Sequence, residues 1–370
     1  MRSAVDVDQV FGTGFVADAR HYERFFYVDW VLAQVALIAT LWLYSRRGAS
    51  FARESAAGPI GTGMLLGMLG LGIVWLVQLP FRVALHWWAR RHDTSDTGYL
   101  DWLFGDWALL AVEFLLVCIA LVIVMGLAQW LGERWWMPGA AVFVAIAALF
   151  LLVAPYLDFT THPLRDESLR AAASRYEREL GVGEIPLRVE EVSETTDLAN
   201  AVAQGIGPSR RIVFWDTILK PPFSAGEQRV VLAHELAHHS QRHLPKGIAW
   251  FALFALPGAW IIMRATRSRG GMGTPQAVPV ALLVVALLQV ATAPAANWVS
   301  RRMEAEADWK ALEVTRDPGS VEALMVDLSE TSFADPDPPE WAQVLFGTHP
   351  TLGERLAMAR AFAARPPDPG

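Results

Sequence analysis

Long apolar runs without charge alternate with polar blocks along the chain, and the runs predict membrane-spanning helices. A helix needs about 20 residues to cross the roughly 30 Å hydrocarbon core of a bilayer. Six runs approach or exceed that length, at residues 30–44, 58–81, 107–131, 135–157, 247–263 and 270–300. Glu113 interrupts the third run, and the first and fifth runs are short. The pattern therefore predicts six transmembrane helices.

Two polar blocks, residues 158–246 and 301–370, flank the last two runs. Because two spans separate the blocks, both lie on one side of the membrane and can form one domain. We expect an N-terminal membrane domain with about four transmembrane helices over residues 1–157. A second domain covers residues 158–370, and a two-helix transmembrane hairpin interrupts it at about 247–300.

The two ends of the chain lie outside the apolar runs. The segment before the first apolar run contains several acidic residues, so it does not resemble a cleavable signal peptide, and the first span is expected to serve as a signal anchor. Residues 365–370 are rich in proline, and we expect a disordered tail there.

The composition agrees with a membrane protein. Hydrophobic residues make up 53% of the chain and charged residues only 19%, against about 25% in soluble domains. The net charge of −7 provides no basic surface, so we expect no nucleic-acid partner. A single cysteine, Cys118, excludes an intramolecular disulfide and any cysteine-based zinc cluster.

A helix in the first polar block carries the pattern of a metal site. Ser224 and Glu227 form a capping-box pattern that predicts its start. His234 and His238 are four residues apart, so both imidazoles project from one face and can reach one zinc ion. Glu235 lies about 100° around the helix, beside the metal, where it can accept a proton from the attacking water.

A second histidine pair on the same helix, His239 and His243, has the same spacing but no acid beside it. It lacks the base that peptide hydrolysis requires. We interpret these two histidines as polar residues at the membrane edge, with His243 ordering the helix end.

Two histidines leave a catalytic zinc one protein ligand short. After the sixth run, Glu304 and Asp308 share a helix face, while Glu306 lies about 200° around from Glu304. We expect Glu304 to ligate the metal and Asp308 to hydrogen-bond a ligand imidazole.

The stretch from Asn200 to Gly205 precedes a Gly207-Pro208 turn and the strand-like run at residues 211–215. An edge strand here could bind a substrate backbone by strand addition. A plain hairpin fits the pattern equally well, so the residues alone leave both interpretations open.

These motifs together resemble the type I CAAX prenyl protease family, which comprises integral-membrane zinc metallopeptidases of the gluzincin type, and more distantly the HtpX-type membrane proteases. The resemblance covers most of the chain. Its segments are His234–His238, residues 300–308, Asn200-Ala201, residues 211–219, residues 348–350 with Arg355, residues 79–81, residues 91–107 and Trp135-Trp136.

The resemblance implies a mostly α fold, in which a multi-pass transmembrane helical bundle carries a zincin-like α+β metalloprotease domain at the membrane surface. It also implies one Zn²⁺ per chain. The roles that it implies are zinc ligands at His234, His238 and Glu304, a general base at Glu235, a supporting Asp308, catalytic His349 and Arg355 near the reacting centre, and substrate-binding Asn200 and Ala201. The family is drawn with seven spans around a water-filled chamber, whereas the apolar runs here number six.

We therefore expect a membrane-embedded zinc endopeptidase that hydrolyses peptide bonds of membrane-associated proteins or peptides by attack of zinc-activated water. One alternative is an intramembrane protease of the site-2 type. Polar residues just before the motif and the absence of a later Leu-Asp-Gly segment disfavour it. The other alternative is a non-catalytic scaffold or transporter with a relic zinc site, from which Glu235 or a ligand would be expected to be missing.

The chain contains 28 arginines and 3 lysines, a bias that suggests a GC-rich bacterial genome. Bacterial relatives resemble quality-control proteases, so we expect a peptide or membrane-protein substrate in a lipid bilayer and no requirement for an oligomer. Charge counting leaves the orientation open. With a bacterial source, we expect the bacterial cytoplasmic membrane, and the resemblance implies that the protease domain faces the cytoplasm.

Overall fold

The structure, a computed structural model, describes residues 5–92 and 94–365. Its contacts divide the chain into two compact units. Unit 1 comprises Met1–Phe25, Ala148–Gly247 and Ala293–Gly370, and unit 2 comprises Phe26–Ala147 and Ile248–Thr292. The tail expected at residues 365–370 lies outside the described residues, apart from Arg365.

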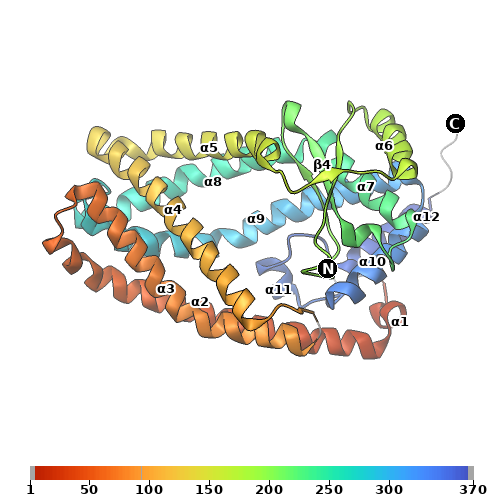
Figure 1. Ribbon diagram of the computed structural model, residues 1–370, viewed down its shortest axis with the longest axis horizontal. Helices are drawn as coiled ribbons and strands as arrows, with labels where there is room; N and C mark the ends of the chain where they lie inside the picture. Colours follow the sequence, from red (N-terminus) through yellow and green to blue (C-terminus); the bar gives the residue numbers. More distant parts are fainter. Residues whose placement is uncertain (1–4, 93, 366–370) are drawn as a thin grey trace. The chain divides into compact units, whose positions relative to one another are not determined.

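Six long helices carry the apolar runs (Figure 1). They are α2 (Thr13–Arg47), α3 (Gly58–Arg91), α4 (Tyr99–Leu131), α5 (Trp136–Leu157), α8 (His243–Thr266) and α9 (Val278–Thr315). The short helical turns beside them are η1 (Gly48–Glu54), η2 (Gly132–Trp135), η5 (Arg267–Arg269) and η6 (Pro275–Ala277). Within the described residues, five segments are long and apolar enough to cross a membrane, since α4, η2 and α5 form one of them. The expectation of a mostly α-helical multi-pass membrane protein is confirmed.

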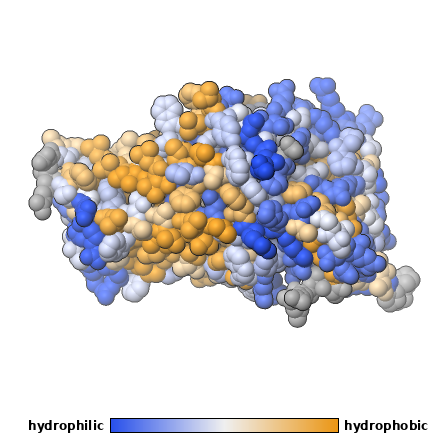
Figure 2. Space-filling model, turned by 90° about the horizontal axis from the view of Figure 1, so that it is seen from below, coloured by the Kyte–Doolittle hydropathy of each residue, from blue (hydrophilic) through white to orange (hydrophobic). Residues whose placement is uncertain are grey.

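The long helices of unit 2 present apolar side chains outward. Leu76, Leu109 and Leu116 are more than half exposed although each belongs to an apolar helix. Figure 2 shows hydrophobic residues gathered over these helices on the face that it displays. A helix that is apolar on every side suits a lipid environment and not water.

Small residues determine how α3 packs against α4. A Cβ atom at Gly63 would lie 2.3 Å from Sδ of Met125, and one at Gly67 would lie 2.6 Å from Cδ1 of Leu121. These glycines are one turn apart on α3, so they form a groove that accepts the larger side chains of α4. Packing of this kind holds membrane helices together, because lipid supplies no hydrophobic driving force between them.

Unit 1 contains a four-stranded sheet with the strand order β1-β2-β4-β3. The strands are β1 (His162–Pro163), β2 (Leu187–Glu190), β3 (Ala201–Gln204) and β4 (Arg211–Trp215). β2 and β4 are parallel, whereas β1 pairs antiparallel with β2 and β3 pairs antiparallel with β4. β4 is fully buried at Ile212, Val213 and Phe214, and β3 forms an edge of the sheet.

The remaining helices of unit 1 surround one hydrophobic core with the sheet. They are α1 (Val7–Phe11), α6 (Glu167–Leu180), α7 (Ala225–Ser240), α10 (Pro318–Ser332), α11 (Glu340–Leu345) and α12 (Leu352–Ala363). Tyr176 of α6, Leu236 of α7 and Leu356 of α12 are all buried in this core. The part of α9 beyond residue 293 also belongs to unit 1, so α7 and the end of α9 lie in the same compact unit.

Candidate metal centre

The capping box expected at the start of α7 is present. Oγ of Ser224 accepts the backbone N–H of Glu227 over 3.4 Å, and Oε2 of Glu227 accepts the backbone N–H of Ser224 over 2.8 Å. Leu232 and Leu236 are fully buried in the core. The cap fixes where the helix begins and the apolar face fixes its rotation, and together they determine where the histidines point.

The structure brings His234, His238 and Glu304 together. Their ligand atoms all lie within 4.8 Å of one another. Nε2 of His234 is 3.0 Å from Nε2 of His238 and 3.2 Å from Oε2 of Glu304, and Nε2 of His238 is 3.6 Å from Oε1 of Glu304. A tetrahedral zinc ion with bonds of about 2.0–2.1 Å holds its ligand atoms about 3.3 Å apart. Two imidazoles and a carboxylate at these separations fit a catalytic zinc ion.

The charges around His234 favour a cation. Burial lowers the pKa of this imidazole, but the contacts and charges of Asp308 and Glu304 outweigh burial and raise it to about 10. Nearby carboxylates stabilise any positive charge held between them, whether it is a proton or a metal ion. The negative charge around His234 therefore favours a bound cation, as the two imidazoles and the carboxylate of the cluster do.

Glu235 is buried beside the ligands and does not belong to the ligand cluster. Its Oε2 accepts the backbone N–H of Ala203 on β3 over 2.6 Å. Burial raises the pKa of Glu235 to about 7, although the positive charge of His234 opposes the shift. A carboxyl group with a pKa near 7 can both accept and return a proton at neutral pH.

Asp308 lies behind His234. Its Oδ1 is 2.9 Å from Nδ1 of His234, the ring nitrogen that does not face Glu304. Arg355 of α12 holds the carboxylate of Asp308 through two hydrogen bonds, from Nε over 2.8 Å and from a terminal nitrogen over 2.6 Å. Arg355 therefore contacts Asp308, which in turn contacts the imidazole.

His349 reaches the cluster from the loop between α11 and α12. Its Nε2 is 3.2 Å from Oε2 of Glu304, and its side chain is 55% exposed. The loop is tied down on both sides, because Gln343 donates to the carbonyl of His349 over 2.7 Å and Arg301 donates to the carbonyl of Gly347 over 2.6 Å. His349 is thus both accessible and positioned.

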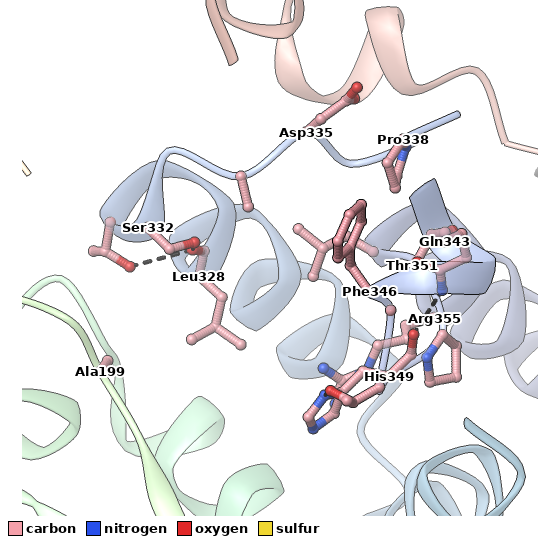
Figure 3. A pocket seen from close by; sticks show the side chains of 16 residues that line it. Ala199, Leu328, Ser332, Asp335, Pro338, Gln343, Phe346, His349, Thr351 and Arg355 are labelled. Carbon is pink, nitrogen blue, oxygen red and sulfur yellow. Dashed lines mark hydrogen bonds between the residues drawn. The ribbon is translucent and has the colours of Figure 1, made fainter. Parts of the chain in front are cut away.

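A cavity of about 440 Å³ opens next to His349 (Figure 3). Figure 3 shows Leu328 and Ser332 on one side of it and Phe346, Thr351 and His349 on the other. Its lining combines apolar side chains, such as Leu328 and Phe346, with polar ones, which suits a side chain of a bound peptide.

Asn200 and Ala201 lie at the start of the edge strand. Trp215 donates its backbone N–H to the carbonyl of Asn200 over 3.0 Å, so Asn200 faces β4. Successive residues of a strand turn their backbone groups to opposite sides, so Ala201 and Ala203 face away from β4. The bond from Ala203 to Glu235 lies on that side. The open edge of β3 therefore runs past the proposed base.

Sequence reasoning missed the environment of two residues. His243 does not simply end a helix, because it contacts the ring of His238, and Glu306 contacts His243. A spacing of five residues does not share a helix face, so no periodic pattern could have indicated the first contact.

Comparisons with known proteins relate the chain to metalloproteases. Over 308 residues the chain is 27% identical to the uncharacterized metalloprotease YhfN of Bacillus subtilis. That alignment covers 78% of this chain and 70% of YhfN. It is 26% identical over 215 residues to a CAAX prenyl protease 1 homolog of Oryza sativa, covering 56% of this chain and 50% of that protein. The chain therefore spans half the length of the rice relative.

The crystal structure of S. mikatae Ste24p has the same fold, with a TM-score of 0.75 at 16% identity. The alignment covers 94% of this chain and 88% of that one. Residues 163–363, more than half of the chain, match peptidase family M48. The expected relationship to membrane metallopeptidases is confirmed, and this chain belongs to peptidase family M48.

Proposed function

We propose that the metal of this membrane metallopeptidase is zinc, that His234, His238 and Glu304 bind it, and that the protein cleaves internal peptide bonds of membrane-associated proteins. The observation that carries the proposal is the set of separations among the three ligand atoms, between 3.0 and 3.6 Å. Glu235, which is buried beside them, supplies the base that a mere binding site would not need.

When bound, zinc would polarise the scissile carbonyl group and lower the pKa of water toward 7. Glu235 accepts the proton of the attacking water and returns it to the leaving amine. The imidazole of His349 donates a hydrogen bond to the carbonyl oxygen as negative charge develops on it. Asp308 orients His234, and Arg355 acts through Asp308 by holding its carboxylate.

The substrate backbone extends along the open edge of β3, where Ala201 faces the side of the sheet that carries Glu235. Strand addition of this kind supplies affinity through main-chain hydrogen bonds and leaves alternate side chains to be selected by pockets. The cavity beside His349 receives one of those side chains. Asn200 supports this edge through the bond from Trp215.

Two alternatives are disfavoured by specific observations. A site-2 type protease carries its HExxH motif within a membrane span, whereas α7 lies outside all five apolar segments found in the described residues. A relic site is disfavoured because His234, His238, Glu304 and Glu235 are all present and converge.

For the orientation, we propose a bacterial cytoplasmic membrane with the peptidase residues and both termini on the cytoplasmic side. The arginine-rich composition supports a bacterial source, and the rice relative and Ste24p support a membrane peptidase. Substrates are then polypeptides reached from the cytoplasm, with membrane-protein segments as the favoured class.

The test uses the full chain purified in detergent. Metal content is measured first, and cleavage of casein and of a detergent-solubilised membrane protein is then followed before and after treatment with a chelator. We expect bound zinc, loss of cleavage with the chelator, and recovery when zinc is added back. Cleavage that continues at full rate in metal-free protein would refute the proposal.

A further inference from the structure

His243 is buried against His238 although it belongs to a different helix. Its Nδ1 lies 2.9 Å from Nδ1 of His238, and the two rings meet edge to face with their centroids 4.9 Å apart. Only 4% of His243 is exposed. A buried imidazole with one nitrogen on another ring is a specific hydrogen-bonding arrangement and not a loose packing contact.

The other nitrogen of His243 also has a partner. Its Nε2 lies 3.1 Å from Oε2 of Glu306, and Nζ of Lys246 lies 3.3 Å from the same oxygen. The side chains of Glu306 and Lys246 are both more than two-fifths exposed. A continuous row of contacts therefore runs from His238 through His243 to a carboxylate at the surface.

A sharp turn of the backbone makes the contact possible. In an uninterrupted helix His243 would lie about 140° around from His238 and could not reach its ring. Instead α7 ends at Ser240, Arg242 adopts a left-handed conformation with φ 56°, and α8 begins at His243. The chain accepts an uncommon backbone conformation at a non-glycine residue here, and that conformation folds His243 back onto His238.

Only one placement of protons satisfies the row of contacts when His238 binds a metal. Nε2 of His238 faces His234 and Glu304, so it must offer its lone pair there and carry its proton on Nδ1. That N–H donates to Nδ1 of His243, which must be unprotonated. His243 then carries its proton on Nε2 and donates it to Glu306, because a carboxylate can only accept.

We propose that His243 and Glu306 are positioning residues that hold the His238 imidazole in its metal-binding tautomer and orientation. The inference rests on the proposed metal site. His234 has Asp308 in the corresponding place, so each imidazole has its own partner on the nitrogen that faces away from the ligand cluster. The two partners differ, since Asp308 contacts its imidazole with a carboxylate, whereas His243 stands between His238 and the carboxylate of Glu306. Such partners set the basicity of a ligand and limit its rotation.

The experiment measures zinc affinity by competition with a chromophoric chelator, on the full chain purified in detergent and stripped of metal. His243→Leu removes the acceptor at similar bulk, and we expect a 10- to 100-fold weaker affinity. His243→Asn places a carbonyl oxygen near the position of Nδ1 and is expected to recover most of the affinity. Glu306→Gln is expected to give a smaller loss, several-fold.

Two matched controls separate positioning from packing. His239→Leu removes a buried histidine at the end of α7, whose Nε2 contacts the backbone carbonyl of Arg211. Glu313→Gln removes another carboxylate of α9 that pairs with a lysine, Lys310. Both variants should bind zinc as the wild type does. Cobalt-substituted protein adds a spectroscopic measurement, because the visible spectrum should shift in His243→Leu and not in the controls.

Wild-type affinity in His243→Leu, or equal losses in His243→Leu and His243→Asn, would overturn the inference, because packing alone would then account for His243. If His243→Leu does not fold, Glu306→Ala decides, since Glu306 lies at the surface and its truncation spares the core. Unchanged affinity in Glu306→Ala would then refute the inference. Wild-type protein that binds no zinc would refute the proposed function itself, which is a different result.

Discussion

The backbone N–H of Ala203 donates to Oε2 of Glu235 over 2.6 Å, across 32 residues of sequence. This bond connects the edge strand β3 to the helix that carries both histidine ligands. It orients one carboxylate oxygen of Glu235 toward the strand. This hydrogen bond therefore links the proposed substrate-binding strand directly to the proposed base.

Glu235→Gln should lower cleavage by about 10²- to 10⁴-fold while zinc stays bound, because an amide keeps the size of the side chain and its bond to Ala203 but cannot accept the proton. Cleavage rates and zinc per chain are measured on the same preparation. Turnover at the wild-type rate would exclude Glu235 as the base.

His349→Ala should reduce kcat by about 10²-fold and leave zinc affinity unchanged, since the proposed role of this side chain is to donate to the developing oxyanion. The side chain is more than half exposed, so its removal should not disturb the fold. Steady-state kinetics and metal analysis check this together. A variant that loses zinc with full activity per bound zinc would show that His349 acts on the metal instead.

Asp308→Asn should weaken zinc binding by about 10- to 100-fold, because the partner of His234 would lose its charge. Arg355→Lys should give a smaller loss, since an ammonium group retains the charge but not the paired hydrogen bonds of the guanidinium group. Chelator competition measures both. A larger loss in Arg355→Lys than in Asp308→Asn would contradict the proposal that Arg355 acts through Asp308.

The raised pKa of Asp327 on α10 should make the free energy of unfolding depend on pH. Burial, with a hydrogen bond and the charge of Glu227, raises the pKa of Asp327 to about 6. The folded state keeps this proton up to about pH 6, whereas the unfolded chain releases it near pH 3.9, so folding loses stability as pH rises through this window. Asp327→Asn should therefore stabilise the protein by about 1 kcal/mol at pH 8 and by little at pH 4.

The apparent Tm of Asp327→Asn and of the wild type at pH 4 and pH 8 tests this prediction, with the exposed Asp197→Asn as the control. A Tm difference between Asp327→Asn and the wild type that is the same at both pH values would contradict it.

Local patterns explain how much of the molecule could be predicted from sequence. Membrane spans can be predicted because a span in lipid needs only sufficient length and apolar residues. The convergence of His234 and His238 follows from their spacing of about one helical turn. The packing of Gly67 against Leu121 could not be predicted, because nothing local to either residue specifies its partner.

Contacts between distant segments escaped prediction for the same reason. Arg355 and Asp308 are 47 residues apart, and their pairing depends on how α12 packs on the core. The contact of His243 with His238 depends on the left-handed conformation of Arg242, which the sequence does not reveal because arginine adopts it rarely. Interpretation of His243 as a helix-end residue therefore missed its contact with a proposed ligand.

Zinc content per chain, compared between the wild type and Glu304→Ala, tests the central claim most directly. Glu304 is the one proposed ligand outside α7, so it alone reports whether α9 completes the site. Glu313→Ala, which alters a carboxylate farther along the same helix, serves as the control. The account predicts about one zinc in the wild type and in Glu313→Ala, and little or none in Glu304→Ala. About one zinc in Glu304→Ala, bound as tightly as in the wild type, would contradict it.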